Sequence, residues 1–295
     1  MSVWKRFGGT LNAVQGAGVE AEIHHFSYGV ITPILAYAFS VLGSLLGLTC
    51  TARARTASGR RRGWWLVLAA AAVGGTGIWV MHFMAMLGFG VVGTEIRYDL
   101  PVTAVSAVIA ISVVAVGLFL AGYGRPTPIK IISGGLFAGL GVAGMHYTGM
   151  AAMRIAGRVD YDKSLVAASV IIAVVAATVA LWFTVVVRRG LAIVAAGLVM
   201  GVAVSGMHYT GMAAMRVQLH EVGEPLSGAT AISLIVPMTV LVILVVIGLG
   251  YAVLAAPTEE DRAGIAYVDE RMARRLARPA PPPPPASSGF VRRGR

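Results

Sequence analysis

The chain has 295 residues, of which 57% are hydrophobic and 13% are charged, and its mean hydropathy is +0.78. A soluble globular protein carries about twice that share of charged residues, so the composition excludes an ordinary soluble fold. The net charge of +11 does not indicate nucleic-acid binding, because the excess lies between apolar segments, as described below. The single cysteine, Cys50, excludes a disulfide framework and a cysteine-based metal site.

Residues 1–24 lack a signal-peptide pattern, since Lys5 and Arg6 are followed by polar residues, and we expect an external N-terminal segment. Residues 25–254 then hold apolar stretches of about 20 residues or more, each long enough to cross a bilayer as a helix. In chain order the stretches are 27–50, 64–87, 101–122, 131–153, 165–187, 191–215 and 230–254. The predicted fold is all-α, a bundle of seven transmembrane helices with an internal two-helix repeat.

Residues 255–295 form a Pro- and Arg-rich tail that we expect to be cytoplasmic and largely disordered, apart from a short amphipathic helix around 265–276. Anionic headgroups and an unidentified cytoplasmic signalling partner are its expected contacts. The tail is too short for a catalytic output domain, and the chain shows no phosphate-binding loop or hydrolase motif. The chain is therefore not expected to be an enzyme.

The positive charges are segregated along the chain. Of the 24 Lys and Arg residues, 17 fall in the tail and in the connections after the first, third and fifth helices. Cytoplasmic connections carry such an excess, so we expect the N-terminus outside and the C-terminus inside a bacterial cytoplasmic membrane. The bilayer is then the partner that the charges indicate, and nucleic acid is not.

An internal repeat is the most informative feature of the sequence. The segment GMHYTGMAAMR at 144–154 recurs unchanged at 206–216, and a weaker copy, MHFMAM at 81–86, precedes both at a similar spacing. Each period contains two crossings, so the three copies lie at the outer ends of the second, fourth and sixth helices. The glycines and alanines around them let helices approach closely.

Positions i, i+4 and i+7 of a helix share one face, and each copy places one histidine and at least one methionine on it. The stripes are His82, Met86 and Phe89; His146, Met150 and Met153; and His208, Met212 and Met215. Imidazole and thioether favour copper over hard cations, and neither brings a negative charge into the membrane. The sequence therefore predicts an outer-leaflet copper site. Its candidate ligands on these stripes are His82, His146, His208, Met86, Met150 and Met212.

Other residues are expected around the ligands rather than among them: Tyr147, Tyr209, Met153, Met215 and His25. The alternative interpretation is structural, with methionines as packing and histidines as interhelical hydrogen-bond donors. His24 and His25 resemble a degenerate fourth copy, and His220 is expected to be a solvated loop residue. Arg154 and Arg216 are expected to anchor helix ends in lipid headgroups.

At Met145-His146-Tyr147-Thr148 and Met207-His208-Tyr209-Thr210 the sequence resembles the MHYT family of bacterial membrane sensor domains. The resemblance covers residues 25–254 and implies copper coordination and the sensing of oxygen, carbon monoxide or nitric oxide. By motif position, that role passes to Met81, His82, Met145, His146, Tyr147, Met207, His208 and Tyr209. The first copy departs from the motif at Phe83 and Met84, which excludes a tyrosine role there.

Two alternative functions remain open at the level of the sequence. One is a haem-binding membrane redox protein in which two of His82, His146 and His208 ligate haem b. The other is a copper transporter or insertion factor, which would need ligands at several depths. Methionines lie away from the motifs only at isolated positions such as Met200 and Met238.

Overall fold

The computed structural model describes residues 19–188, 190–219, 226–254, 267–268 and 270–272. Expectations for residues 1–18, for His220 and for nearly all of the tail lie outside these described residues. The chain divides into two compact units, 1–249 and 250–295, and the site lies in the first.

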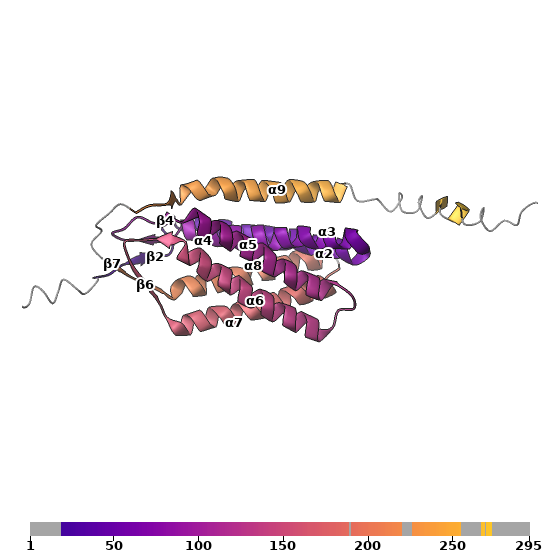
Figure 1. Ribbon diagram of the computed structural model, residues 1–295, viewed down its shortest axis with the longest axis horizontal. Coiled ribbons are helices and arrows are strands. Elements are labelled where there is room, and N and C mark those ends of the chain that lie inside the picture. The colour runs from indigo at the N-terminus through magenta and orange to yellow at the C-terminus, as the bar shows by residue number, and fades with distance from the viewer. Residues whose placement is uncertain (1–18, 189, 220–225, 255–266, 269, 273–295) are drawn as a thin grey trace, which may run out of the picture. The chain divides into compact units, whose positions relative to one another are not determined.

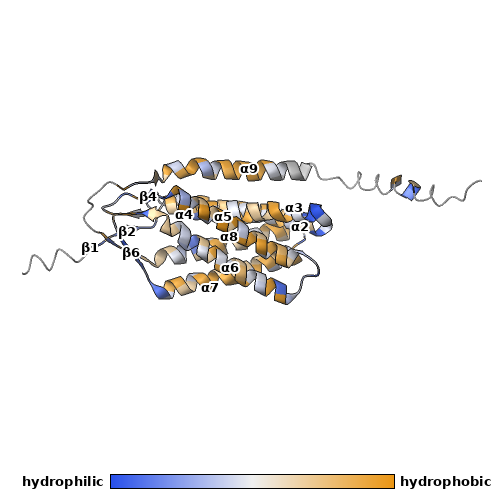
Figure 2. Ribbon diagram, in the orientation of Figure 1, coloured by the Kyte–Doolittle hydropathy of each residue, from blue (hydrophilic) through white to orange (hydrophobic). Residues whose placement is uncertain are grey.

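Apolar helices make up most of the first unit, and Figure 1 shows all but the last of them running side by side. They are α2 (Ile31–Thr56), α3 (Gly59–Ala70), η1 (Ala71–Val80), α4 (Met81–Leu87), α5 (Leu100–Gly122), α6 (Pro128–Ala151), α7 (Lys163–Val186), α8 (Gly190–Ala213) and α9 (Ile235–Leu254). A short 3₁₀ turn, η2 (Ile232–Leu234), precedes α9. The segments α3, η1 and α4 form one continuous helix, and Figure 2 shows hydrophobic residues along most of these helices.

Six helices among the described residues are long and apolar enough to cross a membrane, which agrees with a helical membrane fold. The seventh expected crossing falls on α9, where the apolar stretch Ile232–Gly248 is shorter than the other six. The count of seven therefore remains a prediction. The first helix also begins later than expected, at Ile31, and continues to Thr56.

Helices α6 and α8 end two residues earlier than the sequence indicated. The backbone N–H of Asp99 donates to the carbonyl of Ala152, and that of Asp162 donates to the carbonyl of Ala214, each at 2.8 Å. These donors satisfy carbonyls that a helix end leaves open, and the chain continues as a strand. Met153 and Met215 consequently lie in strands, so their predicted place on a helical stripe with the histidines is wrong.

Short strands gather at one end of the bundle, so the expectation of a purely helical fold is corrected there (Figure 1). They form three antiparallel sheets: β1 (Val19–Glu20), β7 (Met215–Leu219) and β6 (Gly157–Tyr161); β2 (Ile23–His24) and β3 (Gly90–Val91); and β5 (Met153–Arg154), β4 (Arg97–Tyr98) and β8 (Ala229–Thr230). We call these sheets the strand cap. The sequence analysis did not predict it, and six of its eight strands have only two residues, too few to show a readable period.

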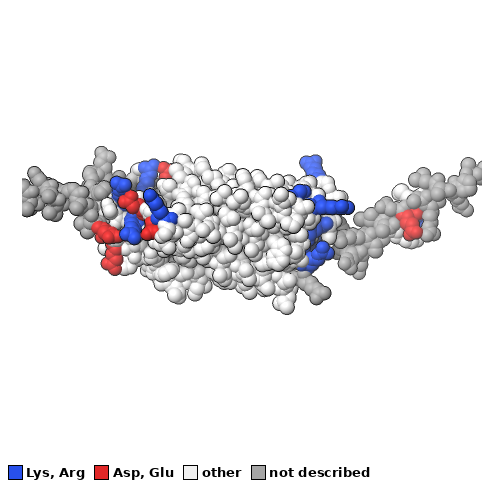
Figure 3. Space-filling model, turned by 90° about the horizontal axis from the view of Figure 1, so that it is seen from below, with Lys and Arg blue, Asp and Glu red and all other residues white. Residues whose placement is uncertain are grey.

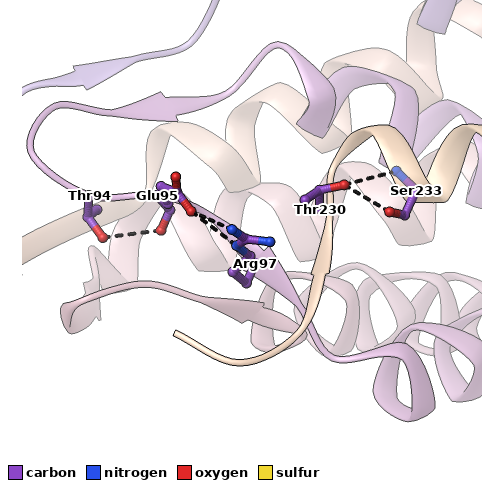
Figure 4. Close-up of polar contacts among 5 residues, drawn as sticks. All are labelled: Thr94, Glu95, Arg97, Thr230 and Ser233. Atoms are coloured by element: carbon purple, nitrogen blue, oxygen red, sulfur yellow. Dashed lines mark hydrogen bonds and ion pairs between the residues drawn. The ribbon is translucent and has the colours of Figure 1, made fainter. Parts of the chain in front are cut away.

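Polar side chains flank the part of the strand cap where β4 pairs with β8. Arg97 lies opposite Thr230 in the ladder and donates to the Glu95 carboxylate at 2.7 Å through its Nη2. The Thr230 and Ser233 hydroxyls are 2.8 Å apart at the start of η2, as Figure 4 shows. The backbone pairing of β4 with β8 ties the loop between α4 and α5 to the segment that leads into α9.

Backbone packing sets the register of the helix that carries the first motif copy. Residues Ala71–Val80 are wound as a π-helix, a form that is rare and often found at functional sites. A Cβ added to Gly74 would lie 2.7 Å from the carbonyl oxygen of Ala110 in α5, and one on Gly43 of α2 would lie 2.3 Å from the nitrogen of Gly77. The three helices therefore touch through their backbones immediately before α4.

The two ends of the first unit differ in charge, as the sequence predicted. Lys and Arg side chains occupy one end in Figure 3, whereas the strand cap carries both signs. We call the end occupied by Lys and Arg the basic end. It holds Arg53, Arg55, Arg60, Arg61, Arg62, Arg125, Lys130 and Arg188. All the ion pairs formed within the described residues 19–254 lie at the strand cap.

Candidate metal centre

Three histidines, one from each motif copy, meet inside the bundle next to the strand cap. His82 on α4, His146 on α6 and His208 on α8 are each at most 1% exposed. The Nδ1 atom of His82 lies 2.9 Å from that of His208 and 3.2 Å from that of His146. The ring centroids are 4.9 to 5.1 Å apart, so the repeat brings three imidazoles into direct contact.

Glycines of the motif orient the rings. A Cβ added to Gly149 would lie 2.3 Å from Nε2 of His82, and one added to Gly211 would lie 2.3 Å from Nε2 of His146. Each of these imidazoles therefore rests its outer nitrogen on the glycine of the next copy and turns Nδ1 inward. The sequence analysis gave these glycines only a general packing role. Their recurrence at the same place after each histidine of the exact copies was the signal that would have identified them.

Hydrogen bonding alone does not satisfy this cluster. A neutral imidazole offers one N–H donor and one lone pair, and the three Nε2 atoms have no partner among the described residues. Among the described residues, the hydrogen-bond distances of the Nδ1 atoms are to each other. The His82 Nδ1 atom has one in-plane site, either a lone pair or an N–H, and cannot satisfy both neighbours with it. An unsatisfied buried polar group costs about 1–3 kcal/mol. A cation that accepts all three Nδ1 lone pairs would remove that conflict on the inner side.

The candidate methionines are also inside the bundle, with side chains at most 2% exposed: Met81, Met86, Met145, Met150, Met207 and Met212. Met81 packs in a cluster with Ala36 and Ala85, against which Tyr209 also packs. Both the methionines that directly precede the histidines and those one turn after them are buried, so burial does not distinguish the two sets as ligands.

The motif tyrosines contact the histidines that precede them. The Tyr147 ring lies 4.9 Å from that of His146, and the Tyr209 ring lies 5.0 Å from that of His208, both edge to face. The Tyr147 hydroxyl is 2.7 Å from the Ser169 hydroxyl on α7, whereas the buried Tyr209 hydroxyl has no partner among the described residues. The two exact copies are therefore not equivalent in their surroundings.

In the first copy Phe83 replaces the tyrosine, so the serine that corresponds to Ser169 has a different hydrogen-bond partner. Ser106 takes the place in α5 that Ser169 takes in α7, and it accepts from the indole N–H of Trp79 at 3.0 Å. Trp79 lies one turn before Phe83 on the same helix. An indole thus stands in for the missing phenol, a substitution that the sequence analysis missed.

His25 and His24 lie outside the three-histidine cluster. The His25 ring packs 5.8 Å from that of Phe89 and 6.4 Å from that of Phe26, and partial burial lowers its pKa. His24 belongs to β2, where it lies 3.8 Å from the Glu22 carboxylate. The fourth motif copy that the sequence suggested is therefore not joined to the other three.

The arginine that ends each exact copy pairs with an aspartate, and its expected anchoring in headgroups stays a prediction. Arg154 binds Asp99 at 2.5 Å, and Arg216 lies 3.6 Å from Asp162. The same aspartates cap α5 and α7 by accepting from backbone N–H groups. The Arg154 guanidinium lowers the pKa of Asp99, and the Ser164 hydroxyl lowers that of Asp162. The contribution of these two ionised carboxylates to folding stability is present at neutral pH, and it is lost as the pH falls through their lowered pKa values.

Comparison with known proteins identifies the family of the chain. The profile of the MHYT family, described as "bacterial signalling protein N terminal repeat", matches residues 75–134, 139–197 and 201–266. The chain belongs to the MHYT family. No solved structure matches it.

The similar proteins are signalling proteins. The bifunctional diguanylate cyclase/cyclic di-GMP phosphodiesterase MucR of Pseudomonas aeruginosa is 38% identical over 65% of this chain and 29% of its own length. The cyclic di-GMP phosphodiesterase NbdA of the same organism is 40% identical over 48% of the chain and 19% of its own length. The signaling protein YkoW of Bacillus subtilis is 29% identical over 64% and 24%, respectively.

The chain thus spans less than a third of each of these relatives, and the matches cover the MHYT region rather than a catalytic one. Together with the six apolar helices, they assign the protein as a multi-pass membrane protein with a sensor or signalling role. No catalytic domain is evident within the described residues.

Proposed function

We propose that the protein is a membrane sensor whose three clustered histidines hold one copper ion and whose input is a diatomic gas or a change of redox state. The observation that carries this proposal is the convergence of three buried Nδ1 atoms with separations of 2.9 and 3.2 Å. Copper would supply reversible one-electron chemistry and an affinity for oxygen, carbon monoxide or nitric oxide.

The donor set supports a soft or borderline ion. Within the described residues the cluster contains His82, His146 and His208 and no carboxylate, so it is unsuited to magnesium or calcium. Buried methionines in every copy favour copper over zinc because thioethers are soft ligands. A metal-bound histidine commonly donates its other N–H to an acceptor, and here packing against Gly149 and Gly211 orients the rings instead.

The ring contacts also favour a single ion over haem. Two axial histidines must leave a slot for the porphyrin between them, whereas these imidazoles touch at their inner nitrogens. The cluster lies at one depth of the bundle, which supports a fixed centre more than a transport path. Haem b and copper transport are therefore the less favoured functions.

Two small apolar cavities support a gaseous input. One of about 50 Å³ is lined by Met207, which directly precedes His208, and by Met200, which lies about two turns earlier in α8. A second of about 60 Å³ shares Met200, Val73 and Ile78 with it and continues toward the basic end. Apolar cavities of this kind stay dry and accept small nonpolar molecules. A diatomic gas dissolved in the bilayer is therefore a suitable ligand.

We further propose that the basic end faces the cytoplasm of the bacterial plasma membrane, because cytoplasmic connections carry the excess of Lys and Arg. The metal centre then lies on the outer side. A reporter fused at 125–130 should read cytoplasmic, and one fused at 158–163 should read external; the reverse result would place the histidines inside. Signalling to a cytoplasmic partner through residues 255–295 remains a prediction.

The proposal is tested on the purified full-length protein by metal analysis and absorption spectroscopy. We expect one copper per chain and no Soret band. A Soret band with iron would favour the haem function, and zinc in place of copper would keep the metal centre but remove the redox input. Metal-free protein that does not take up copper on titration would contradict the proposal.

The same measurement assigns the methionine ligands. The double substitution Met150→Leu/Met212→Leu keeps volume and apolarity, costs less than about 1.5 kcal/mol per site and removes two sulfurs. If those sulfurs are ligands, copper retention falls while Met200→Leu leaves it unchanged. A loss seen instead with Met145→Leu/Met207→Leu would assign the ligands to the methionines that precede the histidines.

A further inference from the structure

A second cavity system lies at the basic end, away from the histidines. A cavity of about 270 Å³ is lined by three arginines from separate segments: Arg55 on α2, Arg62 on α3 and Arg188 just after α7. We call it the arginine cavity. The C-terminal parts of α2, α5 and α7 form most of its remaining wall, and Leu66 of α3 and Pro126 complete it.

Part of this positive charge stabilises helix ends. Arg55 donates to the carbonyls of Thr184 and Val187, and Arg62 donates to that of Gly122, which are open carbonyls at the ends of α7 and α5. A guanidinium has five N–H donors, so these bonds leave donors over. The Arg62 Nε atom is buried without a partner among the described residues.

The remaining charge is not balanced by nearby carboxylates among the residues described within 19–254. Every Asp and Glu described within residues 19–254 belongs to the strand-cap end, and so does every ion pair there. Three guanidinium groups around one cavity repel each other unless an anion lies among them. The arginine cavity therefore has the charge and the free donors of a phosphate site.

An apolar groove adjoins the arginine cavity. It has a volume of about 520 Å³, lies between α6 and α7 and shares Pro126 and Val185 with the cavity. Ile132 and Trp182 line it and are 60% and 49% exposed, on helices that are long enough to cross a membrane. Its lining is thus open to the hydrocarbon of the bilayer, where an acyl chain is the available occupant.

We propose that the arginine cavity and the α6–α7 groove together bind one anionic phospholipid of the leaflet at the basic end. Its phosphate lies among Arg55, Arg62 and Arg188, and an acyl chain lies along Trp182 and Ile132. Basic pockets between transmembrane helices bind lipid headgroups in this way. Free inorganic phosphate would satisfy the arginines but leave the groove unused. The proposal does not depend on the histidine centre.

The test uses the full chain purified in mild detergent and exchanged into nanodiscs of phosphatidylcholine with or without phosphatidylglycerol. Retained lipid is counted by native mass spectrometry. Arg188→Gln is the informative variant, because Arg188 lines the cavity while Arg55 and Arg62 also hold helix ends. Arg60→Gln is the matched control, since it removes the same charge from the same end without lining the cavity.

We expect the wild type and Arg60→Gln to retain phosphatidylglycerol selectively, and Arg188→Gln to bind it about tenfold or more weakly, which corresponds to one charge-assisted hydrogen bond. Trp182→Ala should weaken lipid retention as well. Equal losses in Arg188→Gln and Arg60→Gln would show a general surface potential and overturn the site. Protection from heat by inorganic phosphate in pure phosphatidylcholine discs, unaffected by Trp182→Ala, would overturn the lipid as the ligand.

Discussion

Replacing any one of the clustered histidines with alanine is expected to lower the copper affinity of the protein by at least about 100-fold. Each of His82, His146 and His208 supplies one of the three converging Nδ1 atoms, so a single loss leaves two donors and an open position. The second and third substitutions should add much less than the first, because groups that act as a unit are not additive. Copper per chain and its dissociation constant give the measurement.

His24→Ala is the matched control, since His24 lies in β2 outside the cluster, and it should keep full copper. Circular dichroism and thermal unfolding show whether the variants remain folded, because a buried imidazole also contributes packing. Unchanged copper in a folded triple variant would mean that the histidines are only packing groups.

Gly149→Ala and Gly211→Ala are expected to destroy the same centre although neither replaces a proposed ligand. The added methyl would lie 2.3 Å from Nε2 of His82 or His146, well inside van der Waals contact, so the imidazole must rotate or the helices must separate. Overpacking of this kind typically costs about 1–3 kcal/mol. We therefore expect a lower unfolding temperature and a loss of copper that approaches that of the histidine variants.

The motif provides the control for this prediction. Gly144 and Gly206 lie just before the histidines of the two exact copies, and a Cβ added at either meets nothing within 4 Å. Alanine there should be tolerated, and it gains about 1 kcal/mol of helix propensity over glycine. If all four glycine variants bound copper equally, the proposed seating of the rings on Gly149 and Gly211 would be wrong.

Much of the membrane fold follows from local properties of the sequence. The length of each apolar stretch determines a helix because backbone groups in hydrocarbon must bond internally, and six of the seven expected stretches form such helices. The repeat period determines that His82, His146 and His208 share one depth, because each period contains two crossings. The placement of Lys and Arg likewise predicted the charge difference between the two ends (Figure 3).

Other features depend on contacts between residues far apart in the chain. The inward turn of Nδ1 in His82 is decided by Gly149, which belongs to the next copy of the motif, and the end of α6 is decided by the N–H of Asp99. A helical pattern states which residues share a face, but not which neighbouring backbone fills the space beside a ring. The tertiary structure alone therefore decided the ring orientation, the strand cap and the removal of Met153 from the helical stripe.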